Sequence, residues 1–255
     1  MDAFGKLLIC VSVLLAPTQL TAEQPILAVS DVWCPYTCEP DSEMPGFTVD
    51  IAKTVFEAEG YSLTYEPMPW ARALKETAAG RADIALTAVT GNTAGNFIHQ
   101  LPLGRDETVI VVRKGEAFKF TSTEQLDNLS LGVIVDYTYD NFGILDQYIS
   151  QRKATENSIM TVFSDQGVAQ LIKMLSKRHI DAFFENRYVT NYFLQQANLS
   201  EQFEIIDTGQ GDNIYLAFSP NERGQKLLAL FNQEFPKLIK NGEYQKILDR
   251  YGINH

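Results

Sequence analysis

The stretch Ala73–Leu86, "ALKETAAGRADIAL", decides the fold because its pattern returns at Leu171–Phe184 as "LIKMLSKRHIDAFF". Each stretch runs from a helix through a tight turn to an aspartate, Asp83 or Asp181, and then into an apolar strand. The two aspartates fall at equivalent points of the pattern. A helix-turn-strand unit that occurs once in each half of the chain favours two similar α/β units over one continuous sheet.

The segments around the first copy alternate between strand patterns and helix patterns. Strand patterns are present in "PILAVSDVW" (25–33), "YSLTYEPM" (61–68) and "ADIALTAV" (82–89). Helix patterns are present in "GFTVDIAKTVFEAEGY" (46–61) and "WARALKETAAG" (70–80). This β-α-β-α-β order predicts a parallel sheet that helices cover on both faces.

The second half of the chain repeats this order, and its last segments then return to the first unit. Residues 129–149 read as a strand that enters a helix, residues 213–220 as a strand, and residues 223–252 as two helices broken near Asn241 and Gly242. If these last helices pack on the first unit, the chain crosses between the units twice, near Val111–Gly115 and near Gly211–Leu216. Two crossing strands form a hinge.

We therefore expect an α/β protein of two lobes joined by two hinge strands. The predicted division gives residues 23–112 to the first part of lobe 1, residues 113–212 to lobe 2 and residues 213–255 to the return into lobe 1.

Residues 1–22 have the pattern of a cleavable export signal. Lys6 precedes the apolar run Leu7–Ala16, and small residues follow up to Ala22. The run is shorter than the ~20 apolar residues of a membrane span, and no other window approaches that length. The net charge of -11 argues against nucleic acid as a partner, because an acidic surface repels phosphates. We expect a monomer that is not membrane-embedded and lies outside the cytoplasm, in the periplasm.

The mature chain keeps one close cysteine pair, Cys34 and Cys38, in "SDVWCPYTCEP" (30–40). In an exported protein such a pair favours a disulfide; a metal site is the alternative, but it lacks a nearby histidine or a second ligand pair. Closing so small a ring contributes only about 2 kcal/mol by the chain-entropy formula. We therefore expect the bridge to fix the directions of Trp33 and Tyr36.

The order of these motifs resembles the family-3 extracellular solute-binding proteins. The resemblance rests on "PGFTVDIAKTVFEAEG" (45–60), "PWARALKETAAGRADIALTAVT" (69–90), "LSLGVIVDYTYD" (129–140) and "NGEYQKILDRYG" (241–252), and it covers nearly the whole mature chain. It implies a type II periplasmic binding fold with one small ligand between two lobes. It also implies delivery of a polar, amino-acid-like solute to an ABC-type transporter permease.

One departure from the family concerns the carboxylate clamp. Members that bind α-amino acids usually carry an Arg a few residues after the strand equivalent to "ADIALTAV", whereas here no Arg follows until Arg105. Arg72 is the nearest cation that could substitute, because it lies in the first turn of a helix where the dipole disfavours an unpaired cation. Glu66 is its alternative partner.

Other candidate ligand-binding residues follow the predicted strands of lobe 1. Trp33, Tyr36 and Trp70 would supply aromatic walls at the carboxyl ends of strands, where open α/β sheets bind ligands; packing at the rim is the alternative. Polar groups at the mouth of the strand 82–89 are Thr87, Thr90 and Asn92, for which loop capping is the alternative.

Lobe 2 adds the stretch "DYTYDN" (136–141) and the residue Glu185. Thr138 is expected to cap the following helix and Tyr139 to join the site, with free amides that could seat an anion, although Asp136 and Asp140 oppose one. By resemblance Glu185 receives the amino group of the ligand; Arg187 is the alternative partner. Four acids in the first loop are read as a solvated face: Asp31, Glu39, Asp41 and Glu43.

No catalytic order, phosphate loop or metal spacing is present, so we expect neither an enzyme nor a cofactor or metal. The predicted function is capture of a small polar, amino-acid-like or amine-bearing ligand for a transporter. Two alternatives stay open: an enzyme on the same fold, such as a cyclohexadienyl dehydratase, and a sensor accessory protein.

Overall fold

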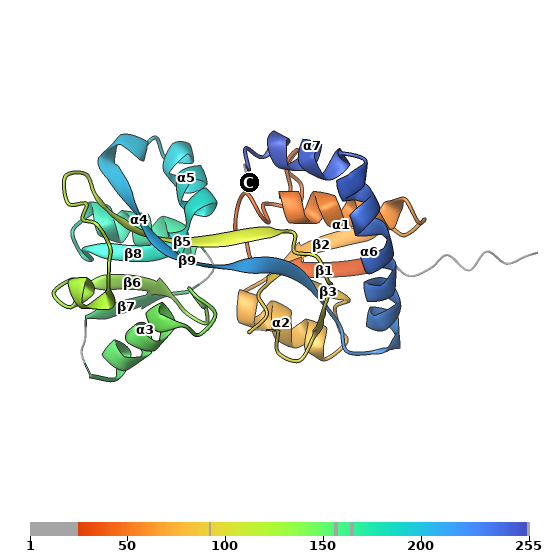
Figure 1. Cartoon of the computed structure of the whole chain (residues 1–255), viewed down its shortest axis with the longest axis horizontal. Helices are drawn as coiled ribbons and strands as arrows, with labels where there is room; N and C mark the ends of the chain where they lie inside the picture. Colours follow the sequence, from red (N-terminus) through yellow and green to blue (C-terminus); the bar gives the residue numbers. More distant parts are fainter. Residues whose placement is uncertain (1–24, 92, 156–157, 164–165, 254–255) are drawn as a thin grey trace, which may run out of the picture.

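The computed structural model describes residues 25–91, 93–155, 158–163 and 166–253, so the predicted export signal at 1–22 lies outside the described residues. The chain forms two α/β lobes that two long strands connect (Figure 1). Among the helices of the described ranges, none combines the length and the apolar character that a membrane crossing requires.

Lobe 1 is built on a mostly parallel sheet. Strand β1 (Ile26–Ser30) lies between β2 (Leu63–Pro67) and β3 (Ile84–Ala88) and pairs in parallel with both. The last residues of β9 (Phe203–Phe218) pair antiparallel with β3 and with the short β4 (Phe97–Ile98). The carboxyl ends of β1, β2 and β3 therefore open on one edge, as the sequence predicts.

Helices cover both faces of this sheet. Helices α1 (Phe47–Glu57), α6 (Glu222–Lys240) and α7 (Glu243–Arg250) pack on one face, and α2 (Trp70–Ala78) packs on the other (Figure 1). The break that was predicted near Asn241 and Gly242 is confirmed, because Gly242 adopts a φ of 83° between α6 and α7.

Lobe 2 repeats the layered arrangement. Its sheet runs β5-β8-β6-β7, with parallel pairing among β8, β6 and β7. These strands are β5 (Gly104–Arg113), β6 (Leu131–Ile134), β7 (Ile159–Val162) and β8 (Ala182–Asn186). Helices α4 and α5 lie on one side of the sheet and α3 on the other (Figure 1). Their bounds are α3 Ile144–Thr155, α4 Gly167–Ser176 and α5 Arg187–Gln196, and the 3-10 turns are η1 Thr123–Leu126 and η2 Ser200–Gln202.

The hinge consists of β5 and β9, which pair antiparallel from Gly104 with Ile214 to Arg113 with Phe203. The first crossing lies earlier than Val111–Gly115, because Thr108–Val111 already pair with β8 of lobe 2. The predicted lobe boundaries stay a proposal. The pairing of β5 with β8 favours a first boundary near Glu107.

The two aspartates of the sequence repeat play the same role in their lobes. The carboxylate of Asp83 accepts the N–H of Leu27 at 2.9 Å, and that of Asp181 accepts the N–H of Ser130 at 3.0 Å. Each carboxylate also pairs with an arginine, Arg223 for Asp83 at 2.7 Å and Arg113 for Asp181 at 2.9 Å. The predicted equivalence of the two positions is confirmed.

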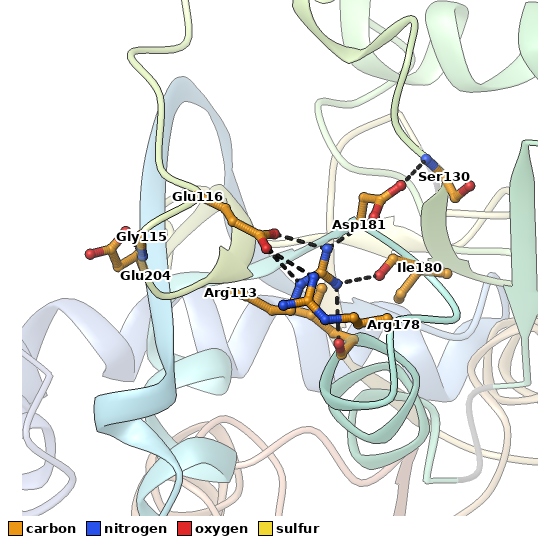
Figure 2. A network of polar contacts seen from close by, with 9 residues as sticks. Arg113, Gly115, Glu116, Ser130, Arg178, Ile180, Asp181 and Glu204 are labelled. Carbon is orange, nitrogen blue, oxygen red and sulfur yellow. Dashed lines mark hydrogen bonds and ion pairs between the residues drawn. The ribbon is translucent and has the colours of Figure 1, made fainter.

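Figure 2 shows the lobe 2 version of this ion pair at the outer end of β5. The guanidinium of Arg113 donates to the backbone oxygen of Ile180 at 2.7 Å and pairs with Glu116 at 2.8 Å, and Arg178 also reaches Glu116 at 3.2 Å. The network ties the start of β8 to the strand that enters the lobe, so it fixes the sheet that carries Glu185.

Candidate functional site between the two lobes

The loop after β1 is a small, covalently closed turn. Cys34 and Cys38 form a disulfide with their Cα atoms 4.8 Å apart, and Trp33 exchanges backbone hydrogen bonds with Thr37 across the turn. The rings of Trp33 and Tyr36 stack with centroids 4.3 Å apart, and Tyr36 packs in turn on Phe47 of α1. The predicted bridge is confirmed, and the turn holds the Trp33 indole toward lobe 2.

Trp33 reaches a buried acid of the opposite lobe. Its indole N–H donates to Oε1 of Glu185 at 2.9 Å, and the same oxygen accepts the backbone N–H of Asn186 at 2.7 Å. Glu185 is 2% exposed, and its Oε2 has no hydrogen-bond partner among the described residues. Burial raises the pKa of Glu185 to about 8 against the lowering effect of these two hydrogen bonds.

A second contact between the lobes joins Tyr137 to Asp31. The Tyr137 hydroxyl donates to Oδ2 of Asp31, which lies directly after β1 and is 5% exposed. The backbone oxygen of Asp31 accepts hydrogen bonds from Thr37 at 2.8 Å and Tyr65 at 3.1 Å. The interpretation of Asp31 as part of a solvated acidic face is therefore wrong, because the turn and β2 bury it.

The hinge contributes a third acid. Asp106 on β5 lies opposite Asp212 on β9, and its Oδ1 accepts a hydrogen bond from the Asn186 side chain at 2.8 Å. Burial raises the pKa of Asp106 to about 7, the Asn186 hydrogen bond lowers it, and the carboxylate of Asp212 raises it further. Asn186 also donates to the Tyr36 hydroxyl at 2.9 Å, so one amide links the turn, the hinge and β8.

These groups surround a small cavity of about 40 Å³ between the lobes. Lobe 1 and the hinge supply Asp31, Trp33, Trp70, Thr87, Val89 and Asp106, and lobe 2 supplies Tyr137 and Thr138. Since a water needs about 10–15 Å³ of such volume, the cavity holds a few waters or a small head group. The lobes are thus closed on each other, and a larger ligand requires them to separate.

Thr87 lies on the cavity wall in an unusual backbone conformation. Its φ is 65° at a register shift between β3 and β9, and its hydroxyl donates to the backbone oxygen of Leu86 at 2.6 Å. A β-branched residue with positive φ is a genuine outlier and is concentrated at ligand sites. Thr87 thus lines the cavity with a strained backbone.

A wider groove begins on the other side of Asp31. It has a volume of about 430 Å³, and its apolar lining comes from both lobes: Val32, Pro67, Met68 and Pro69 from lobe 1, and Ala169 and Phe193 from lobe 2. Asp31, Glu39 and Gln166 complete the lining. Because Asp31 lines both spaces, the cavity and the groove are neighbours.

Several backbone amides in the turn before α3 and in its first turn donate to protein carboxylates. Asp146 accepts the N–H groups of Tyr139 and Phe142 at 2.9 and 2.8 Å, and Asp140 accepts those of Leu145 and Asp146 at 2.7 and 3.1 Å. The predicted helix cap at Thr138 is wrong, because α3 begins at Ile144 and the Asp140 carboxylate accepts the N–H groups of Leu145 and Asp146 in its first turn.

The structure places the predicted site residues in three groups. Lining the cavity are Trp33, Trp70, Thr87 and Thr138, and Glu185 adjoins it through Trp33. Tyr36 and Tyr139 are buried behind the walls: the Tyr36 hydroxyl donates to the backbone oxygen of Arg105 at 2.7 Å, and the Tyr139 hydroxyl accepts the N–H of Ile134 at 2.7 Å. Their ligand-binding roles stay a prediction, and Asn92 lies outside the described residues.

The remaining polar candidates lie away from the cavity. Arg72 is exposed on α2 and, within the described part of the chain, forms no ion pair with Glu66. Thr90 is exposed and accepts a hydrogen bond from the Asn141 side chain of lobe 2 at 3.1 Å. Arg187 pairs with Glu107 and Asp207 rather than with Glu185, so the alternative internal partner of Glu185 is not observed.

Sequence reasoning missed three residues that the fold brings together: Asp31, Asp106 and Tyr137. Two of them had a usable signal, because Asp31 follows a buried strand and Tyr137 lies inside the loop already singled out. Asp106 had none, since its place depends on which residue of β5 crosses between the lobes.

Comparison with known proteins agrees with this architecture. The sequence model of the bacterial extracellular solute-binding proteins, family 3, matches residues 26–254. A search of curated protein sequences gives no match.

Solved structures with a similar fold include the following three. An ancestral arginine-binding protein bound to arginine has a TM-score of 0.73 and 18% identity, over 89% of this chain and 97% of that one. A histidine kinase sensor domain with similarity to periplasmic binding proteins has a TM-score of 0.74 and 17% identity, over 90% of this chain and 96% of that one. A structure concerned with glutathione import via GshT and the cystine ABC importer TcyBC of Streptococcus mutans has a TM-score of 0.74 and 19% identity, over 89% of this chain and 93% of that one.

At these sequence identities the structural matches show only that the fold is similar. The family match, by contrast, extends over nearly all of the described chain. Together with the two lobes, the paired hinge strands and the cavity between them, it identifies this chain as a member of the bacterial extracellular solute-binding proteins, family 3.

Proposed function

We propose that the protein captures a small polar, amine-bearing ligand between its lobes and delivers it to the permease of an ABC-type transporter. The observation that carries the proposal is the set of acids at the cavity: Asp31 and Asp106 line it, and Glu185 adjoins it with one oxygen unpartnered in the described structure. Burial keeps Glu185 largely protonated in the ligand-free cleft, and a ligand amine favours the ionised form of these acids by pairing with it.

The mechanism is a population shift between open and closed lobes. A ligand that contacts Trp33 and Trp70 on lobe 1 and Tyr137 on lobe 2 touches both sides only when the lobes are closed. It therefore stabilises the closed form by its extra contacts there. The cystine ABC importer named with one structural relative supports a transporter partner, and the sensor domain among the relatives keeps a signalling receptor as the alternative.

The test uses the chain from residue 23 onward, free of the predicted export signal. Both tryptophans of the chain, Trp33 and Trp70, line the cavity, so a bound ligand changes their fluorescence directly. The panel contains amino acids, primary amines, polyamines, dicarboxylates and small peptides. A ligand at about 100 times its dissociation constant adds about 2.7 kcal/mol of stability, which a thermal melt detects. A panel without any change in fluorescence or melting temperature contradicts the proposal.

A second candidate function is catalysis in the same cleft. The observation in its favour is Glu185, because a buried carboxyl with a pKa of about 8 holds a proton at neutral pH and can act as a general acid. The first ligand identified in the panel decides between them: incubation with catalytic amounts of protein, followed by NMR, leaves the ligand unchanged if the protein only binds it.

A further inference from the structure

The described lining of the cavity offers no cationic partner for a ligand carboxylate. Its lining contains two carboxylates and, among the residues that the structure describes, neither lysine, arginine nor histidine. Arg72 points into solvent from α2, and Arg105 is exposed on the hinge, where it lines a separate pocket with Glu107 and Asp207. Both cations that could replace the family clamp are therefore outside the site.

The second possible seat for an anion is also filled. Five hydrogen bonds from the backbone of residues 139–146 end on the carboxylates of Asp140 and Asp146. An anionic ligand at this turn would have to displace both carboxylates and would meet their negative charge. The five amides of Tyr139, Asp140, Phe142, Leu145 and Asp146 are thus not available to the anion contact that was predicted at Thr138.

The same surfaces suit a cation. Asp31 and Asp106 lie on the wall. Oε2 of Glu185, which has no partner among the described residues, is buried beyond Trp33. Three aromatic side chains, Trp33, Trp70 and Tyr137, line the space between them. Ring faces attract ammonium groups, and buried carboxylates pair with them, so both kinds of lining favour the same charge.

The size of the two spaces sets the shape of the ligand. The cavity of about 40 Å³ takes little more than an ammonium group, whereas the neighbouring groove of about 430 Å³ is lined by Val32, Met68 and Phe193. Asp31 belongs to both linings, so a molecule with its charge at Asp31 extends naturally into the groove. An apolar arm would bury its surface there.

We infer that the cleft binds an amine that has no carboxylate and carries an apolar arm, with its ammonium group beside Asp31 and Asp106 and its arm against Met68 and Phe193. This inference rests on the proposed function and names the ligand class of the same site.

Matched pairs of compounds test the inference by isothermal titration calorimetry. Each pair is an amine and the amino acid that contains it: phenethylamine with phenylalanine, tyramine with tyrosine, and 3-methylbutylamine with leucine. We expect each amine to bind about tenfold more tightly than its amino acid, or better, because the carboxylate meets like charge. An amino acid that binds as tightly as its amine overturns the inference.

Two variants test the two ends of the ligand. Asp31→Asn lowers the affinity for phenethylamine about thirtyfold or more, since it removes a buried charge partner. The matched control is Asp41→Asn, which changes the net charge equally at an exposed position of the same loop and leaves the affinity unchanged. Phe193→Ala, at a half-buried position on the edge of the core, lowers the affinity for phenethylamine about tenfold. Equal losses in Asp31→Asn and Asp41→Asn contradict a direct contact.

The outcomes separate this inference from the proposed function. If the amines fail and a different class from the wider panel binds with a change in tryptophan fluorescence, the ligand class is wrong and the binding function stands. If no compound of either set binds, both fail.

Discussion

At the scale of single residues, Glu185 decides how the cleft responds to its surroundings. One of its oxygens accepts two N–H groups, from Trp33 and Asn186, and the other has no partner in the described structure. Burial outweighs the two hydrogen bonds, so the carboxyl keeps its proton until pH approaches its pKa of about 8. Closing the lobes on Glu185 is thus linked to binding a proton.

We expect the ligand-free protein to open as pH rises from about 5 to about 8, between the usual pKa of a glutamate and the pKa of Glu185 in the closed form. The pKa of Glu185 in the closed form is about 8 against a usual value of 4.5, so the closed form binds the proton more tightly and loses its advantage as pH rises. Asp106, with a pKa of about 7, acts in the same direction. Small-angle scattering should show a radius of gyration that increases with pH.

The variant Glu185→Gln keeps the size of the side chain and removes its charge, so most of this increase should disappear. Glu66→Gln, at an exposed position, is the control and should behave as the wild type. Identical pH profiles for the wild type and Glu185→Gln would show that another group controls closure.

Individual site residues were predictable where the strand pattern places them. Trp33, Trp70 and Glu185 follow or end predicted strands, and the structure brings them to the cleft. Arg72 was expected at the site because of its charge. Its position along α2 decides which face of the helix it lies on, and that face is exposed to solvent. Tyr36 was also expected at the site, but its ring packs against Phe47 and is buried in the core.

At the scale of elements, the turn between β6 and α3 stands out. Three of its residues have positive φ without being glycine: Asp136, Asn141 and Phe142. Asp146 stabilises the turn from the first turn of α3 by accepting the N–H groups of Tyr139, Asp140 and Phe142. This single carboxylate therefore holds the strand-helix connection that carries Tyr137.

We expect Asp146→Ala to lower the free energy of unfolding by about 3 kcal/mol, because it leaves one buried and two partly buried N–H groups without their acceptor. Urea denaturation measures the change. Asp249→Ala removes an exposed carboxylate of α7 and should change stability by less than about 0.5 kcal/mol. A variant Asp146→Ala as stable as this control would mean that water replaces the carboxylate fully.

Elements were predictable where burial is uniform along the segment. The apolar run at β3 and the periodicity of α1 gave the right structures, because all residues of β3 are buried and α1 buries one face. The start of α3 was predicted too early, at Thr138, since backbone conformations such as that of Phe142 leave no signature in residue type. Strand β9 is 16 residues long because its pairing with β5 overrides the turn signal of Gly209 and Gly211.

At the scale of the whole molecule, hydrogen bonds join the closed lobes directly. Besides Trp33 with Glu185, they include Tyr137 with Asp31 and Asn141 with Thr90. The repeat in the sequence predicted two lobes, but no pattern in one sequence gives the angle between them or the volume of the space that remains. Those depend on how the side chains of both lobes fit each other.

We expect Tyr137→Phe to loosen the closed, ligand-free protein, because it removes the donor to Asp31. Hydrogen exchange followed by mass spectrometry should show faster exchange in residues 30–38 and 136–141, with little change in the outer network around Arg113. Tyr148→Phe removes a hydroxyl bonded to Asp127 on the outer side of lobe 2 and is the matched control. Equal exchange in both variants would show that the Tyr137 contact does not hold the lobes.

The paired hinge strands have a further consequence. Lobe 2 is one uninterrupted segment that leaves lobe 1 on β5 and returns on β9, its immediate neighbour in the sheet. Such a segment can be exchanged as a cassette between related proteins through two adjacent splice points, without cutting the core of its host. Recombination of this kind would pair the Trp33 and Trp70 half of the cleft with a foreign partner half, and could generate new specificities faster than point substitution.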